Sequence, residues 1–258
     1  MRSIWNGSIS FGLVTIPIKM YSGSEDRKVD LDMLDKNDHA RIRYKRVNEV
    51  TGEEVPWKDI VKGYRQDEAY VILTDEDFAK ANQKKSKTID IEEFIAEDEV
   101  EEVLFKKPYF LEPQKDGEKS YNLLKNALKD TGKLGVATFV MRQKENLSLI
   151  GVYKEALVLH VIRFADELRN PADLKLPDAE VSKREVDMAK SLIEQYTEKF
   201  DFEKYKDIYN EQLMDIIKAK SSGKVIPSEK FEAKATPAKD LMAQLKASLE
   251  KKKKSKAS

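Results

Sequence analysis

The residues of this sequence best suited to chemistry form a short basic run, RIRYKRV, from Arg41 to Val47. Side chains on an extended strand alternate between two faces, so Arg41, Arg43 and Lys45 are expected on one face. Three like charges in a row repel one another unless an anion lies across them. The run therefore indicates an anion-binding face or an ordinary solvated strand, and its residues alone favour neither.

Further lysines follow this run along the chain. Lys58 and Lys62 lie four residues apart after Pro56, where a short helical turn would place them on one face. A second cluster, Lys84, Lys85 and Lys87, precedes a predicted strand. The C-terminus ends in a third cluster, which contains Lys251, Lys252, Lys253 and Lys254.

Motifs for other chemistry are absent from the sequence. It has no cysteine and two histidines, which excludes disulfides and thiolate zinc sites, and it has no phosphate-binding glycine loop or nucleophile elbow. The acidic run from Glu97 to Glu102 is typical of a solvated turn, since consecutive acids point in different directions. His160 is expected to pack in the core. We therefore predict that the chain is not an enzyme and needs no cofactor or metal.

Charge is unevenly distributed over the 258 residues, although the formal net charge is zero. From Lys220 onward there are 11 lysines against 4 acids, a net charge of +7, so the preceding body carries −7. A neutral total does not argue against nucleic-acid binding, because phosphates respond to local patches. No apolar run reaches the roughly 20 residues of a membrane span, which predicts a cytoplasmic protein without membrane contact.

The basic run must be positioned by a β-rich body. Between Ile9 and Tyr21 the apolar positions shift by one residue at Gly12, which predicts one strand with a bulge, and Pro17 predicts a position at an edge or at the bulge itself. Short strands are also expected at 30–34, 70–73, 103–105 and 108–111. A helix at 117–131 and a meander of three antiparallel strands at 134–142, 147–153 and 156–164 complete the expected barrel.

Beyond Pro177 the apolar period changes from that of a strand to that of a helix. Ser182 and Glu185 form a capping box, and a second helix is expected at 207–219. The first helix carries an apolar stripe that a barrel cannot cover, which predicts a dimer interface. Its members are Val186, Ala189, Leu192, Ile193, Tyr196 and Phe200.

Several long words of the sequence occur together in one order. They are RSIWNGSISFGLVTIPIKMYS at the N-terminus, then RIRYKRV, GEEVPWKDIVKGY, YVILTDEDF and KPYFLEP. In these words the chain resembles the bacterial Ku family, the DNA-end-binding proteins of non-homologous end joining. The resemblance covers residues 2–200.

The resemblance implies a mixed β/α fold, with an antiparallel β-barrel core, a β-ribbon bridge insertion, a helical C-terminal arm and a flexible basic tail. It further implies a ring-shaped homodimer that threads ends of double-stranded DNA and recruits an ATP-dependent DNA ligase. By its motifs, Arg41, Arg43, Lys45, Arg46, Lys58 and Lys62 would contact phosphates. The other lysine clusters named above would support this binding. The alternative is a protein-interaction β-barrel that does not bind DNA.

Three segments follow from these observations. Residues 1–177 would form the barrel with its bridge, 178–220 the dimerisation arm and 221–258 the tail. A short amphipathic helix in the tail would present an apolar face to the ligase. Its members are Leu241, Met242, Leu245 and Leu249.

Overall fold

The computed structural model describes residues 1–81, 87–223, 243–246 and 248 of the chain. It divides into two compact units, one formed by Met1–Arg27 with Asp32–Asn170 and the other by Lys28–Leu31 with the C-terminal part from Pro171. In the described residues, no helix is both long and apolar enough to cross a membrane.

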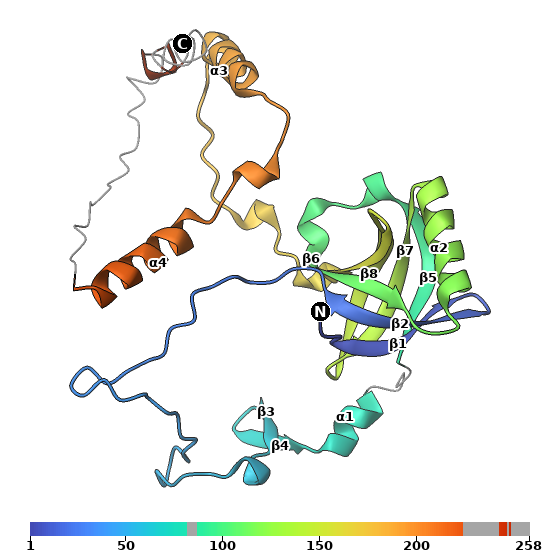
Figure 1. Ribbon diagram of the computed structural model, residues 1–258, viewed down its shortest axis with the longest axis vertical. Helices are drawn as coiled ribbons and strands as arrows, with labels where there is room; N and C mark the ends of the chain where they lie inside the picture. Colours follow the sequence, from blue (N-terminus) through green and yellow to red (C-terminus); the bar gives the residue numbers. More distant parts are fainter. Residues whose placement is uncertain (82–86, 224–242, 247, 249–258) are drawn as a thin grey trace. The chain divides into compact units, whose positions relative to one another are not determined.

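The first unit contains a closed barrel (Figure 1). Its strands are β1 (Trp5–Phe11), β2 (Val14–Ser22), β5 (Thr88–Ala96), β6 (Phe105–Pro113), β7 (Lys133–Met141), β8 (Lys144–Tyr153) and β9 (Ala156–Ile162). They follow the order β1-β2-β6-β9-β8-β7-β5. Neighbours are antiparallel except β1 and β5, which pair in parallel and close the barrel. The predicted antiparallel barrel and the meander of β7, β8 and β9 are thus confirmed.

The N-terminal stretch is a hairpin and not the single bulged strand that the sequence predicts. Phe11 of β1 pairs with Val14 of β2, and Gly12 turns the chain with a φ of +58°. A one-residue shift of the apolar set fits either a bulge or a two-residue turn, so the pattern alone could not separate them. Pro17 lies inside β2, where β6 no longer pairs, so its missing N–H costs no hydrogen bond.

The barrel core is formed by alternate residues of the strands. Ile9 of β1 lies opposite Ile16 of β2, and both are fully buried. Helix α2 (Glu118–Thr131) packs against the barrel and buries Tyr121, Leu124 and Leu128. The Tyr121 hydroxyl donates to the Leu111 carbonyl and accepts from the Leu157 amide, each at 2.7 Å, so α2 is tied to β6 and β9.

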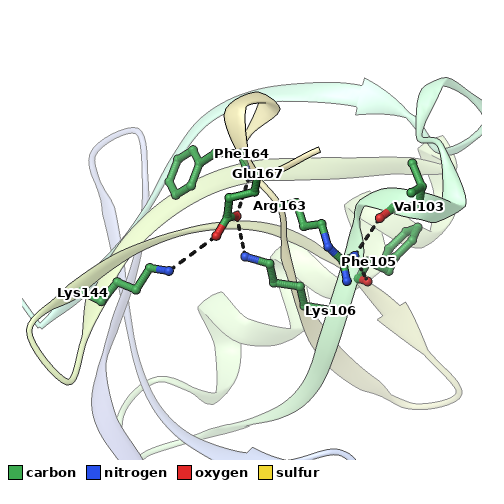
Figure 2. Close-up of polar contacts among 7 residues, drawn as sticks. All are labelled: Val103, Phe105, Lys106, Lys144, Arg163, Phe164 and Glu167. Atoms are coloured by element: carbon green, nitrogen blue, oxygen red, sulfur yellow. Dashed lines mark hydrogen bonds and ion pairs between the residues drawn. The ribbon is translucent and has the colours of Figure 1, made fainter. Parts of the chain in front are cut away.

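One end of the barrel is held by a carboxylate between two lysines (Figure 2). Glu167 contacts Lys106 of β6 at 2.5 Å and Lys144 of β8 at 3.5 Å. Beside it, the Arg163 guanidinium donates to the carbonyls of Val103 and Phe105, each at 2.7 Å. These contacts fix the chain after β9 to both neighbouring strands.

Two other strands form a separate ribbon, β3 (Lys62–Gln66) and β4 (Ala69–Leu73), followed by helix α1 (Asp75–Ala81). The strand predicted at 30–34 is absent, since only Leu34 forms an isolated bridge there. The strand predicted at 108–111 lies within β6, but the one predicted at 103–105 is wrong, since Val103 and Leu104 belong to a 3-10 helix and only Phe105 joins β6. The short 3-10 helices are η1 (Trp57–Asp59), η2 (Glu97–Glu99), η3 (Glu102–Leu104), η4 (Ala165–Glu167), η5 (Pro171–Asp173) and η6 (Phe202–Lys204).

The second unit contains helices α3 (Lys183–Tyr196) and α4 (Ile208–Ser221). The predicted capping box is confirmed, because the Ser182 hydroxyl accepts from the Glu185 amide and the Glu185 carboxylate accepts from the Ser182 amide. Phe200 lies beyond the end of α3, so its predicted place on the helical stripe is wrong. The chain leaves the helix at Thr197, whose extended φ and ψ end the 3.6-residue period.

Candidate nucleic-acid interface

The basic run from Arg41 to Val47 is extended but is not a regular strand, contrary to the prediction. Isolated bridges join Leu34 to Arg41 and Val47 to Glu54. Each bridge closes a tight turn, and at the second turn Gly52 adopts a φ of +70°. The run has no continuous neighbouring strand among the described residues, so a regular ladder does not form.

Two cations of the run already have carboxylate partners. The Arg41 guanidinium pairs with Asp32, and the Lys45 ammonium lies 2.8 Å from Glu54. The sequence predicts a face without interleaved acids. In the structure the two acids come from the neighbouring segments that the bridges join to the run, one before it and one after it. Both cation side chains remain about 70% exposed, at 70% and 72%. Exposed pairs of this kind are worth only about 0.2–1 kcal/mol, so a phosphate could replace either carboxylate.

The other two cations of the run differ in their surroundings. Within the described part of the chain, Arg43 is exposed and forms no ion pair. The Arg46 guanidinium lies 5.0 Å from the centroid of the Trp57 ring, in a cation–π contact. This contact leaves the guanidinium edge free to donate hydrogen bonds, because the ring occupies only its flat face.

Lys58 and Lys62 do not share a helical face as predicted. Helix η1 ends at Asp59, and Lys62 is the first residue of β3. The Lys62 ammonium lies 4.6 Å from the centroid of the Phe78 ring, so it joins β3 to α1. Both lysines are exposed.

Arg65 of β3 is a basic residue that the sequence reasoning did not select. It lies opposite Tyr70 of β4 and is exposed. The sequence feature that could have identified it as a candidate is its position three residues after Lys62. The stretch from Arg41 to Arg65 contains seven basic and four acidic residues. We call residues 41–65 the basic segment.

Lys87 is the described member of its predicted cluster. Its carbonyl accepts a hydrogen bond of 2.9 Å from the Ser8 amide, which fixes its backbone to β1 at the start of β5, and its side chain is exposed. Lys84 and Lys85 lie outside the described residues. So do Lys251, Lys252, Lys253 and Lys254.

Large apolar side chains are exposed around the basic segment. Tyr64 of β3 and Tyr70 of β4 are 67% and 66% exposed, and Trp57 is 73% exposed. The two-stranded ribbon buries none of its own residues. Apolar surface of this extent is typical of a region that another surface covers.

The predicted interface helix also presents its apolar side to solvent within its own unit. Val186, Ile193 and Tyr196 of α3 are exposed, and Ala189 and Leu192 are half-buried. These five share one side of the helix, while Phe200 lies beyond its end. In the tail, Leu245 is half-buried within the helical residues 243–246, and Leu241, Met242 and Leu249 lie outside the described residues.

A family model and individual relatives that match the sequence of the chain agree on one family. The family model described as the Ku70/Ku80 beta-barrel domain matches residues 10–188. The chain is 41% identical to the non-homologous end joining protein Ku of Opitutus terrae over 96% of this chain and 91% of that protein. It is also 41% identical to that of Archaeoglobus fulgidus, over 97% and 99% of the two chains. The Bacillus subtilis protein is 37% identical over 97% and 82%.

The names of these relatives describe end joining and no catalytic activity. This agrees with the prediction that the chain is not an enzyme. It also agrees with the resemblance in the sequence, which rests on the same part of the chain.

Proposed function

The chain belongs to the Ku family of non-homologous end joining proteins, and on this basis we propose that it binds ends of double-stranded DNA without regard to sequence. The single observation that carries the proposal is the near full-length similarity to proteins with this name. The basic segment supports it, because its exposed cations suit phosphates, which are the same at every base pair.

We assign the phosphate contacts first to Arg43, Arg46, Lys58 and Lys62, whose charges face no carboxylate of a described residue within 4.0 Å. Arg41 and Lys45 join them when phosphate replaces Asp32 and Glu54. Lys87 and the lysines outside the described residues are additional candidates. No base contact is required, since a protein that threads an end need only follow the backbone.

We further propose that the binding form is a ring-shaped homodimer. The exposed apolar residues of the basic segment and of α3 support this, because a second copy would remove both surfaces from water. The ring would recruit an ATP-dependent DNA ligase through the tail, and the protein would act in the cytoplasm at the nucleoid. Both steps rest on the family resemblance.

The decisive experiment compares linear DNA with the same DNA as a relaxed, covalently closed circle. We expect retarded complexes on the linear form and little binding to the circle, because a closed ring can be entered only from an end. Equal affinity for both forms would exclude the ring. Equal affinity for linear duplexes of unrelated sequence is expected as well.

A further inference from the structure

A cavity between α2 and the neighbouring barrel strands takes no part in the proposed DNA contacts. It has a volume of about 380 Å³ and is lined by residues of α2, η2 and strands β6 to β9. Its apolar surface comes from Phe105, Leu128, Leu134, Val152 and Val158. This volume is enough to hold one large side chain of a ligand.

Three lysines line this cavity, one from α2, one from the first residue of β7 and one from the turn after β8. Lys129 and Lys133 flank the C-terminal end of α2, and Lys154 lies in the tight turn between β8 and β9, where its φ is +53°. We call the cavity with these residues the lysine-rimmed pocket. Glu97 is the acidic residue that lines it.

The positive rim contrasts with the unit around it. Residues 88–170 contain 12 basic and 16 acidic residues, a net charge of −4. Lys129 lies 3.8 Å from Glu155, which partly neutralises it. For Lys133 and Lys154, the described part of the chain supplies no carboxylate partner, and the Lys154 ammonium lies 5.4 Å from the Tyr153 ring centroid. Two ammonium groups therefore remain available to an anionic ligand.

The wall beside the rim is held in place. The rings of Phe105 and His160 pack edge to face with centroids 5.2 Å apart, and Arg163 holds the Phe105 carbonyl (Figure 2). Burial lowers the pKa of His160, against an opposing effect of the Glu97 charge, so the ring adds no positive charge near neutral pH. The cavity is thus an apolar hollow with fixed walls and a basic rim.

We propose that the lysine-rimmed pocket binds an acidic peptide segment of a partner protein, which inserts one large apolar side chain. Charge complementarity selects the acidic flanks, and the apolar walls select the anchor. A nucleic-acid backbone fits less well, because its phosphates satisfy the lysines but leave the more exposed apolar side chains of Phe105, Leu134 and Val152 without a partner. The site is separate from every residue assigned above to DNA or to the dimer.

The test uses the full chain and a fluorescein-labelled synthetic peptide of seven residues, with one Phe between Asp and Glu residues, in fluorescence polarisation. We expect saturable binding. Replacing the Phe by Gly, or the acids by Asn and Gln, should weaken it about tenfold or more, since each change removes one half of the recognition. No saturable binding, or equal binding by the Gly peptide, would overturn the proposal.

On the protein, Lys133→Glu with Lys154→Glu should weaken peptide binding about tenfold or more. The matched control is Lys115→Glu with Lys119→Glu, which makes the same charge change at exposed positions that do not line the pocket. Circular dichroism checks that both variants are folded. If the first variant is unstable, peptide binding is measured instead on the milder Lys133→Gln with Lys154→Gln variant.

Two outcomes on the protein would refute the peptide site. One is an equal loss of binding in the control variant, which would show a general charge effect. The other outcome combines two results: a short DNA duplex displaces the peptide from the native chain, and the Lys133 and Lys154 variant loses binding to the duplex. Together they would show that the lysines of the pocket bind DNA phosphates. End binding by that variant should otherwise equal that of the native chain.

Discussion

At the scale of single residues, the cations of the basic segment differ in the contacts that they must break before they can bind a DNA phosphate. Arg41 and Lys45 must exchange a carboxylate for a phosphate, so their net gain is small. Arg43 gives up no ion pair with a described residue, and Arg46 keeps its contact with Trp57. Arg43 is therefore the residue at which a lost phosphate contact should be measured most cleanly.

We expect Arg43→Ala to weaken binding to all duplex ends alike. Each lost phosphate contact should make the slope of log affinity against log salt concentration shallower by about 0.9, because fewer counterions are released. Titrations at several salt concentrations measure this slope. Lys19→Ala, at an exposed position on β2, is the control and should leave it unchanged. An unaltered slope in the Arg43 variant would mean that Arg43 is only solvated.

Glu167 is the residue whose ionisation should govern acid stability at the barrel end. Its hydrogen bond from Lys106, the Phe164 amide and the charge of Lys144 lower the pKa of Glu167 from 4.5 to about 2. Because the folded-state pKa is the lower one, the contribution to the free energy of unfolding is complete above about pH 4.5. It is lost as the pH falls toward 2.

Glu167→Gln should therefore be less stable than the native chain at pH 7, and the difference should shrink as the pH falls from 4.5 toward 2. Urea unfolding at pH 7, 5 and 3 measures it. The control is Glu145→Gln, at an exposed position of β8 that pairs with no described cation. If the native chain and the Glu167 variant lose stability in parallel, the Glu167 contacts drawn in Figure 2 do not contribute to stability.

At the scale of elements, α3 is the best candidate for the homodimer interface. Its polar side is solvated, and its apolar side is exposed within its own unit. A short amphipathic helix is only marginally stable in water unless its apolar side packs against another surface. The helix is therefore expected to find its partner surface in a second copy of the chain.

We expect Ile193→Asp to convert the dimer to a monomer, because it places a charge in the centre of the apolar side. Sedimentation velocity measures the change. Ser191→Asp introduces the same residue on the opposite, solvated side of α3 and should leave the dimer intact. A dimeric Ile193 variant would locate the interface elsewhere, with the exposed ribbon of β3 and β4 as the next region to test.

At the scale of the whole molecule, function is expected to divide between the body and the tail. The basic segment carries the first-assigned end-binding residues, while the residues from Lys220 onward carry a net charge of +7 against −7 in the rest of the chain. A cut after Gly223 preserves α4 and its C-terminal cap, in which Ser222 bonds to Lys218 and Ala219. This position therefore separates the two parts without damaging a helix.

The chain truncated after Gly223 should keep its dimer and its end binding. It should lose part of its residence time on DNA at moderate salt and much of its stimulation of end joining by the ligase. A full chain with Leu241→Ala and Leu245→Ala should lose stimulation but keep its residence time. Full stimulation by the truncated chain would place the ligase site on the body.

The sequence by itself determined the features that depend on local pattern. The capping box at Ser182, the helix at 117–131 and the three-strand meander are all local, because propensity, capping and alternation act over a few residues. The long words shared with the Ku family also identified the family. The basic character of the segment from Arg41 was equally readable.

The tertiary structure decided which residues meet across the chain. Asp32 and Glu54 neutralise Arg41 and Lys45, each over a separation of nine residues through a turn, and Trp57 reaches Arg46. The hairpin at Gly12, the parallel pairing of β1 with β5 and the lysine rim assembled from α2, β7 and the turn after β8 are further contacts of this kind. Such contacts depend on the path of the backbone in space. A pattern of neighbours within one strand or helix carries no information about that path.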